Sequence, residues 1–214
     1  SSAASDVYKR QIEDLGGEVD MVIDAGETFF GVESTVVDLT SDRPRLLRPG
    51  PVGPEELERV LGTPVVVTSH ARGLSTYEGS PPSPGMKYKH YAPDKELILV
   101  ERGPCDDGEY IEFLVGVLRG RMPSRPALIA SRETATRVSG LLGDSIGYLV
   151  LGSRVNLYEI ARNLFGVLRD LDRRGDYSLG VAESVEEVGI GLAIMNRLRK
   201  ASSERLVCGR AGAY

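Results

Sequence analysis

The chain has 214 residues, of which 41% are hydrophobic and 27% charged, a composition that excludes a stapled mini-protein, a collagen-like chain and wholesale disorder. Its 25 glycines and 12 prolines indicate many turns, and the net charge of −5 disfavours broad nonspecific binding to nucleic acid. A local basic groove that binds an anion remains compatible with this charge. Since no apolar run is long enough for a membrane span and no signal peptide opens the chain, we expect a soluble, cytoplasmic protein.

The first eleven residues, SSAASDVYKRQ, show neither a strand pattern nor a helix cap. Because VYKRQ resembles a translated sequencing-adapter scar, we expect residues 1–11 to be non-native or disordered. The alternating apolar residues Val19, Met21 and Ile23 then predict a strand. FFGVESTVVDL predicts a second strand, long enough to cross a sheet.

A short strand in RPRLLRPGPV is expected to end at Pro49 and Gly50. The segment GPEELERVLG predicts a helix, because Pro54 suits a first helical position and Gly62 suits the residue after the helix end. A buried strand in PVVVT follows. Residues 12–68 therefore have the pattern of the C-terminal, strand-rich part of a mixed α/β domain.

Residues 69–93 differ in composition, since they hold many prolines and serines and almost no aliphatic side chains. A structureless stretch of this length is usually a disordered tether or a functional lid. We therefore predict an interdomain linker over residues 69–93.

Residues 94–207 alternate short apolar strands with amphipathic helices. The strands are predicted in ELILV, ALIAS, GYLVL and LGVA, and the longest helix begins with the capping pair Asn156 and Glu159. Such alternation is typical of right-handed βαβ units, so we predict a small three-layer parallel α/β domain of the Rossmann-like type. Residues 208–214 would form a tail.

Cysteine and histidine are scarce in the chain. Cys105 and Cys208 lie far apart without a CxxC motif, and the histidines are His70 and His90. We therefore expect two reduced thiols and no bound metal.

The first candidate site combines GVESTVVDLT with LLRPGPV, which places Ser34 and Arg48 at the ends of adjacent predicted strands. A serine hydroxyl can hydrogen-bond a small polar ligand, and an arginine held before Pro49 offers a fixed fork for phosphate or carboxylate. The alternative is a Thr-rich strand face with a surface arginine, and the spacing alone favours this alternative, because a Ser-Thr pair on a strand is common.

The second candidate site is SPGMKYKHYAP in the linker, where Lys87, Lys89 and His90 alternate with Tyr88 and Tyr91. Lysines can neutralise phosphates and an aromatic ring can stack on a base, so this segment could close over a nucleotide. The alternative is a solvated basic linker.

The third candidate is GIGLAIMNRLRKAS, in which Gly189 and Gly191 form only half of a phosphate-binding motif. Close packing of a helix on a sheet is the alternative reading of these glycines. Arg197, Arg199 and Lys200 fall near the predicted helix end, where cations suit the helix dipole. Since no GxSxG, HExxH or P-loop occurs, we expect any enzyme of this sequence to act by positioning and electrostatics.

Taken together, these strings resemble the threonylcarbamoyl-AMP synthase family (YrdC/TsaC type) in its long two-domain form. GVESTVVDL and LLRPGPV resemble the end of the catalytic domain, SPGMKYKHYAP the interdomain linker, and ARNLFGVLRDLD with GLAIMNRLRKA the small C-terminal domain. The resemblance covers about residues 12–207. It implies that residues 12–68 are the C-terminal part of a YrdC-like catalytic domain with a mixed, twisted sheet.

The family makes threonylcarbamoyl-adenylate from L-threonine, bicarbonate and ATP and releases pyrophosphate. Its product serves a downstream transferase machinery that modifies adenosine in tRNA. By this resemblance, Ser34 would contact threonine and Arg48 the ATP phosphates, while Ser83, Lys87 and Tyr88 would close over ATP. Mg²⁺ would accompany ATP and screen its charge. The resemblance implies neither a membrane partner nor direct sequence-specific binding of nucleic acid, and no catalytic residue is assigned.

The sequence departs from the family pattern in one respect. The family's catalytic domain normally begins far upstream, with a K-x-R strand and a Ser-Asn segment that this chain does not contain. We therefore expect these 214 residues alone to be inactive.

Three other functions compete with this prediction. One is a nucleotide-binding regulatory α/β module without catalytic activity, which would use the carboxyl ends of its strands. A second is RNA binding through the basic linker, which the net charge disfavours. A third is carbamoyl transfer in hydrogenase maturation, although this linker and C-terminal domain are not expected in such proteins.

Overall fold

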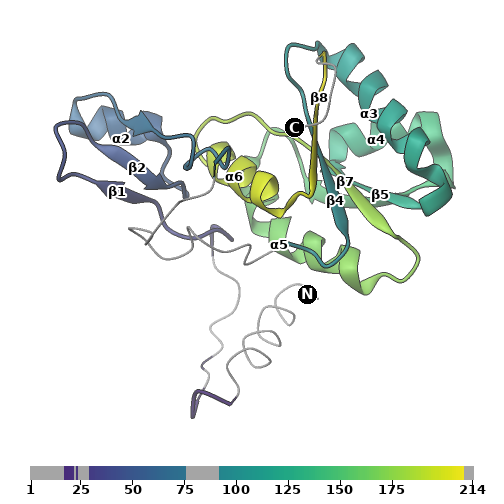
Figure 1. Cartoon of the computed structure of the whole chain (residues 1–214), viewed down its shortest axis with the longest axis horizontal. Coiled ribbons are helices and arrows are strands. Elements are labelled where there is room, and N and C mark those ends of the chain that lie inside the picture. The colour runs from purple at the N-terminus through teal and green to yellow at the C-terminus, as the bar shows by residue number, and fades with distance from the viewer. Residues whose placement is uncertain (1–16, 22, 24–28, 76–91, 210–214) are drawn as a thin grey trace.

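Two separate β-sheets organise the described part of the chain, which comprises residues 17–21, 23, 29–75 and 92–209 of a computed structural model (Figure 1). The smaller sheet has three strands in the order β1-β2-β3, and the larger has five in the order β6-β5-β7-β4-β8. In chain order the elements are β1 Val36–Asp38, β2 Arg45–Arg48, α2 Pro54–Leu61, β3 Val66–Val67, β4 Glu96–Glu101, α3 Asp107–Arg121, β5 Pro126–Ser131, α4 Arg132–Leu142, β6 Gly147–Gly152, α5 Leu157–Arg173, β7 Leu179–Glu183, α6 Gly191–Ala201 and β8 Glu204–Val207. Short 3₁₀ turns, Met122–Ser124 and Gly143–Ser145, follow α3 and α4.

The small sheet is mixed, since β1 pairs antiparallel with β2 and β2 pairs parallel with β3. The helix predicted after it is confirmed: α2 begins at Pro54 and is followed by Gly62 in the left-handed region, at φ +67°. The buried apolar cluster beside this sheet comprises Leu46, Val65, Ala71 and, from α6, Leu192. The small sheet therefore takes part of its core from the C-terminal end of the chain.

Two strand predictions in this region are wrong. Val19, Met21 and Ile23 lie outside any strand and are exposed, and of FFGVESTVVDL only Val36–Asp38 is a strand. Apolar alternation stabilises a strand when one face packs on a core. The side chains of these three residues have no such packing, because they are largely exposed to solvent.

In the large sheet, which contains strands β4 to β8, every pair of neighbouring strands is parallel. This confirms the predicted parallel α/β architecture. Its central strands β5 and β7 are entirely buried and β4 is buried except at its ends, as expected for a sheet covered on both faces. The long helix α5 begins as predicted, with the Asn156 side chain accepting a hydrogen bond from the backbone N–H of Glu159. Strand β8 was not predicted, because its four residues ERLV are half-buried at a sheet edge and only two of them are apolar.

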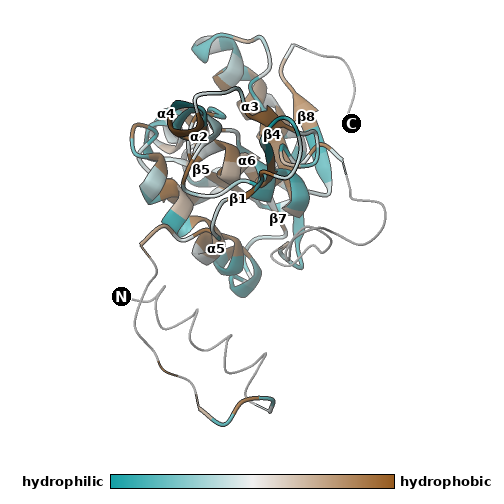
Figure 2. Ribbon diagram, turned by 90° about the vertical axis from the view of Figure 1, so that its left-hand side faces the viewer, coloured by the Kyte–Doolittle hydropathy of each residue, from teal (hydrophilic) through white to brown (hydrophobic). Residues whose placement is uncertain are grey.

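Two apolar cores lie on opposite faces of the large sheet. One contains buried residues of α3 and α4, and the other contains buried residues of α5 and α6. In Figure 1, α6 lies between the small sheet and the large one, and Figure 2 shows hydrophobic residues concentrated around α6 and the central strands. Helix α6 is buried at all its residues except half-buried Lys200, so it contacts both parts of the fold.

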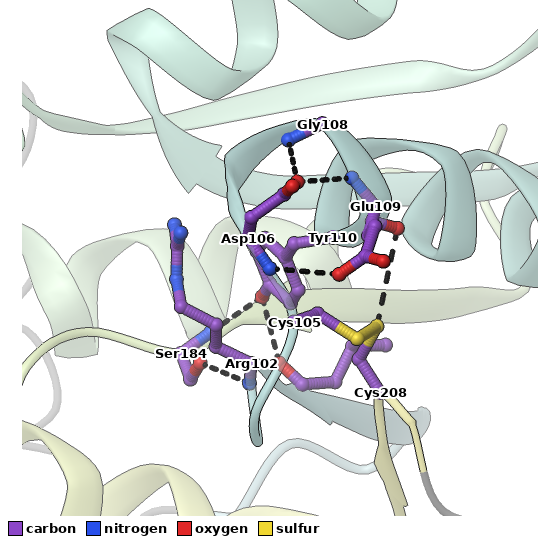
Figure 3. The surroundings of a disulfide bond; sticks show 9 residues. Arg102, Cys105, Asp106, Gly108, Glu109, Tyr110, Ser184 and Cys208 are labelled. Atoms are coloured by element: carbon purple, nitrogen blue, oxygen red, sulfur yellow. Dashed lines mark hydrogen bonds between the residues drawn. A yellow bond between two sulfur atoms is a disulfide. The ribbon is translucent and has the colours of Figure 1, made fainter.

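The prediction of two reduced thiols is wrong, because Cys105 and Cys208 form a disulfide (Figure 3). Strands β4 and β8 are parallel neighbours, with Glu101 opposite Val207, so the residues that follow both strands reach the same edge of the sheet. The Cα atoms of the two cysteines lie 5.9 Å apart, within the range that a disulfide spans. Cys208 is also buried, so it belongs to the domain core rather than to a tail.

None of the helices in the described part of the chain is both long and apolar enough to cross a membrane.

Candidate functional site

Ser34 and Arg48 contact each other at the point where β2 ends and the chain approaches β1. Arg48 Nη2 donates to Ser34 Oγ, and Arg48 Nε donates to the Ser34 backbone oxygen, both at 3.0 Å. Ser34 is exposed and Arg48 is half-buried, so a ligand in solvent can reach both groups. The structure thus brings these two predicted site residues together, whereas their roles in binding stay predictions.

The backbone around this pair is packed too closely for a side chain at position 50. A Cβ atom on Gly50 would collide with the backbone N of Thr35 and the backbone oxygen of Glu33. Thr35 serves a structural purpose, since its Oγ1 donates to Val52 O at 2.9 Å and accepts from Val52 N at 3.2 Å. Of the predicted Ser-Thr pair, only Ser34 therefore presents its hydroxyl to solvent.

Arg197 of α6 fixes the segments on both sides of the Ser34–Arg48 pair. Its Nη2 and Nε donate to Glu33 Oε2 at 2.5 and 3.1 Å, and its Nη1 donates to the Pro49 backbone oxygen at 2.7 Å. Arg197 itself is buried. Glu33 precedes Ser34 and Pro49 follows Arg48, so one guanidinium group holds both neighbours of the pair.

The charge of Glu33 follows from this contact. Burial alone would raise the pKa of the Glu33 carboxyl group, but the charge and hydrogen bonds of Arg197, together with the more distant Arg48, hold that pKa below its ordinary value. The carboxylate is therefore ionised near neutral pH and forms an ion pair with Arg197.

Helix α6 also holds the start of the predicted linker. Asn196 Nδ2 donates to the backbone oxygens of His70 and Ala71 at 3.2 and 2.9 Å. Arg199 Nη1 donates to the Arg72 backbone oxygen at 2.8 Å, and Arg72 in turn pairs with Glu187 at 2.6 Å. Residues 70–72 are therefore docked on the C-terminal part of the chain.

Sequence reasoning missed the positioning residues Asn196, Arg197 and Arg199. The two arginines were interpreted as partners of the helix dipole, but they bind groups distant in the sequence. The one available signal was the density of polar and basic residues on a helix that is otherwise apolar.

The other predicted positions have separate outcomes. Ser83, Lys87 and Tyr88 lie outside the described residues, so their assignment to ATP stays a prediction. A Cβ atom on Gly191 would collide with the backbone oxygen of Glu186, which lies in the loop between β7 and α6, so the close approach at Gly191 is to this loop and not to the sheet. Gly189 donates its N–H to Glu55 Oε2 at 3.3 Å, which is a contact between the loop that precedes α6 and helix α2.

Among the residues that the structure describes, no group of three or more His, Cys, Asp or Glu side chains is placed to hold a metal ion. The basic groups around Ser34 suit an anionic ligand instead.

The chain is similar to known proteins over most of its length. Residues 52–203 match the family described as threonylcarbamoyl-AMP synthase, C-terminal domain, and residues 4–50 match a family described as telomere recombination. The threonylcarbamoyl-AMP synthase of Pyrococcus abyssi is 43% identical over 199 residues, which are 91% of this chain and 53% of that protein. The synthase of Bacillus subtilis is 38% identical over 196 residues, which are 91% of this chain and 52% of that protein.

The solved structures show the same likeness. The crystal structure of P. abyssi Sua5 complexed with L-threonine superposes with a TM-score of 0.70 at 41% identity, and the match covers 92% of this chain and 53% of that one. The chain spans about half the length of the relatives it matches. Because the family match extends over residues 52–203, the chain belongs to the threonylcarbamoyl-AMP synthase family.

Proposed function

We propose that this protein is an L-threonylcarbamoyladenylate synthase, which converts L-threonine, bicarbonate and ATP into threonylcarbamoyl-AMP, pyrophosphate and water. The observation that carries the proposal is the contact between the exposed Ser34 hydroxyl and the Arg48 guanidinium group. Relatives aligned over 91% of the chain bear the name of this enzyme, and one solved relative is complexed with L-threonine.

The two side chains suit the two kinds of substrate. Accepting a bond from Arg48 leaves the Ser34 hydroxyl its own proton to donate to the carboxylate of an amino acid. Arg48 presents a planar fork with several donors, which suits phosphate oxygens. An amino acid at Ser34 and a triphosphate at Arg48 would then lie side by side, as a reaction between them requires.

The remaining components are proposed from the family. Mg²⁺ would enter as the counterion of the triphosphate. Ser83, Lys87 and Tyr88 would contribute to the ATP site from the linker, and the product would pass to a tRNA-modifying transferase in the cytoplasm. We also propose that these 214 residues by themselves do not form the adenylate, because they span about half the length of the named relatives.

The test is formation of threonylcarbamoyl-AMP, measured by mass spectrometry, in the full-length protein that contains this chain. We expect product only when threonine, bicarbonate and ATP are all present. Ser34→Ala should raise KM for threonine, and Arg48→Ala should raise KM for ATP. Arg45→Ala is the matched control, because Arg45 lies on the same strand but is exposed and outside the site.

Two results would contradict the proposal. One is product formation that does not depend on threonine. The other is a set of kinetic constants for Ser34→Ala and Arg48→Ala that equal those of the Arg45→Ala control.

A further inference from the structure

The Cys105–Cys208 disulfide lies beside the edge strand of the large sheet. Strand β8 pairs with β4 alone and consists of four half-buried residues. Cys208 directly follows this strand, and Cys105 lies in the segment between β4 and α3 (Figure 3). A short edge strand opens more readily than the buried centre of a sheet. The disulfide is therefore a covalent cross-link that holds the end of β8 against the segment after β4.

The two cysteines differ in their exposure to solvent. Cys105 is half-buried, whereas Cys208 is only 3% exposed. The backbone oxygen of Glu109 lies 3.9 Å from Cys208 Sγ, so it is placed to accept a weak hydrogen bond from a reduced Cys208 thiol. A thiol in solvent can thus approach the bond from the Cys105 side, and the released Cys208 thiol has an acceptor.

Ion pairs lead from β8 to helix α6. Arg205 of β8 lies 3.0 Å from Glu101, the last residue of β4, and Glu101 also pairs with Arg199 of α6 at 2.7 Å. The side chains of Arg199 and Glu101 are 5% and 14% exposed, so solvent screens their attraction little. Opening of β8 would remove Arg205 and admit water to Glu101, which weakens the hold of Glu101 on Arg199.

Arg199 in turn holds the segment that follows β3. Its Nη1 donates to the Arg72 backbone oxygen at 2.8 Å, and its Nη2 pairs with Glu187 at 2.5 Å. The Arg72 side chain pairs with the same Glu187 at 2.6 Å. Gly73 packs against this turn of α6, because a Cβ atom there would lie 3.2 Å from Arg199 Cβ. Consecutive contacts therefore connect the disulfide with residues 70–73.

We propose that the Cys105–Cys208 disulfide is a redox-sensitive latch, which keeps residues 70–73 docked on α6 while it is intact and loosens them when it is reduced. The reductant would be a dithiol. The inference goes beyond the proposed function and does not depend on it, since it rests on contacts that exist whatever reaction the protein catalyses. The disulfide supplies the two states, and the ion pairs carry the difference to a distant segment.

The redox step is a thiol–disulfide exchange. One thiolate of the dithiol attacks Cys105 Sγ, the bond between the two cysteines breaks, and Cys208 leaves as a thiolate that takes up a proton from water. The second thiolate of the dithiol then attacks the mixed disulfide and releases Cys105. Two electrons pass from the dithiol, which is itself oxidised to a disulfide, to the cysteines, which become two thiols.

Hydrogen exchange followed by mass spectrometry tests the latch in the full-length protein that contains this chain. We expect millimolar dithiothreitol to reduce the bond in the folded protein and to speed exchange at the Arg72 and Gly73 N–H groups by about fivefold or more. These groups donate to the Thr68 and His70 backbone oxygens, so their exchange reports opening of the docked turn. Exchange in the central strand β7 should stay unchanged, because local loosening leaves the core closed.

Variants separate the bond from the reductant. The double variant Cys105→Ser, Cys208→Ser should exchange at Arg72 and Gly73 as fast as the reduced wild-type protein, with or without dithiothreitol. Arg205→Met should speed the same exchange while the disulfide is intact, because it removes the ion pair between β8 and Glu101. Arg119→Met is the matched control, because it removes the same charge from an exposed position on α3.

Three results would overturn the proposal. The first is a bond that dithiothreitol does not reduce in the folded protein. The second is reduction that speeds exchange in β8 but leaves Arg72 and Gly73 unchanged. The third is an equal increase in β7, which would mean that the whole fold opens. None of these readouts involves formation of the adenylate, so failure of the proposed function would leave the latch standing.

Discussion

Arg197 of α6 and Glu33 before β1 form an ion pair across 164 positions of sequence, with Nη2 2.5 Å from Oε2. The same guanidinium group donates to the Pro49 backbone oxygen. The C-terminal helix therefore holds the two chain segments that present Ser34 and Arg48. Removing α6 would remove a support of the candidate site as well as one layer of the parallel domain.

We predict that Arg197→Met destabilises the protein by about 3 kcal/mol, because it leaves a largely buried carboxylate and a buried carbonyl without their partner. Urea unfolding followed by circular dichroism measures this. Arg59→Met is the control: its pair with Glu56 is exposed, and its loss should cost no more than about 0.5 kcal/mol. Equal effects of the two substitutions would show that the Arg197 contact is not a significant support.

Stability should fall in acid. The pKa values of Glu33 and Glu101 both lie below the ordinary 4.5, because nearby arginines outweigh the effect of burial. The unfolded chain therefore binds these protons first, so their stabilisation is complete above pH 4.5 and is lost as the pH falls through the folded pKa values. His70, whose pKa is lowered from 6.5 by burial and by Lys200, adds a loss that begins nearer pH 6.5.

Urea unfolding at a series of pH values measures this dependence. Glu101→Gln should flatten the part of the curve below pH 4.5, since it removes one of these two carboxylates. A free energy of unfolding that stays constant from pH 7 to pH 3 in the wild-type protein would contradict the assignment of acid sensitivity to Glu33, Glu101 and His70.

The disulfide should stabilise the domain by joining the loop after β4 to the end of β8. It closes a loop of 103 residues, so Cys105→Ser or Cys208→Ser should cost about 2–5 kcal/mol. Thermal unfolding with and without dithiothreitol provides the measurement. The double Cys→Ser variant should be insensitive to the reductant, and a wild-type protein equally insensitive would argue against the bond.

Glu183 at the end of β7 is predicted to weaken the fold. It is 1% exposed, and within the described structure neither carboxylate oxygen has a hydrogen-bond partner. Glu183→Met keeps the size of the side chain and should therefore raise stability by about 1–3 kcal/mol.

The same substitution has a spectroscopic readout. Burial and, to a smaller extent, Glu183 raise the pKa of Tyr110 to about 12. Ultraviolet titration measures the pKa of Tyr110, and the Tyr110→Phe variant identifies which part of the signal comes from this residue. The Tyr110 pKa should be lower in Glu183→Met than in the wild-type protein. An unchanged pKa together with a loss of stability would mean that Glu183 has a stabilising partner.

Gly50→Ala should disturb the candidate site through the backbone. The added Cβ would meet the Thr35 nitrogen and the Glu33 oxygen, so we expect a loss of about 2 kcal/mol or more. Gly116→Ala, in an open position on α3, should instead gain up to about 1 kcal/mol from helix propensity. If Gly50→Ala reduced neither stability nor threonine affinity relative to Gly116→Ala, the close approach of Gly50 to the Glu33 and Thr35 backbone would not be important for the site.

Much of the parallel domain could be predicted from local pattern. Its strands are mostly continuous apolar runs, and a helix such as α5 carries its own start signal, Asn156. These preferences act within a few residues, so a single sequence contains them. The small sheet was predicted less well, because its strands are short and part of its buried cluster comes from Leu192, far along the chain.

The sequence by itself determined most helices and strands of the second domain, the parallel α/β type of that domain and the pairing of Ser34 with Arg48 as a candidate site. Only the tertiary structure decided which distant residues meet. The Cys105–Cys208 disulfide and the Arg197–Glu33 contact both link residues more than a hundred positions apart. No local propensity encodes such contacts, since they exist only after the parallel strands have placed distant residues at one edge and α6 between two sheets.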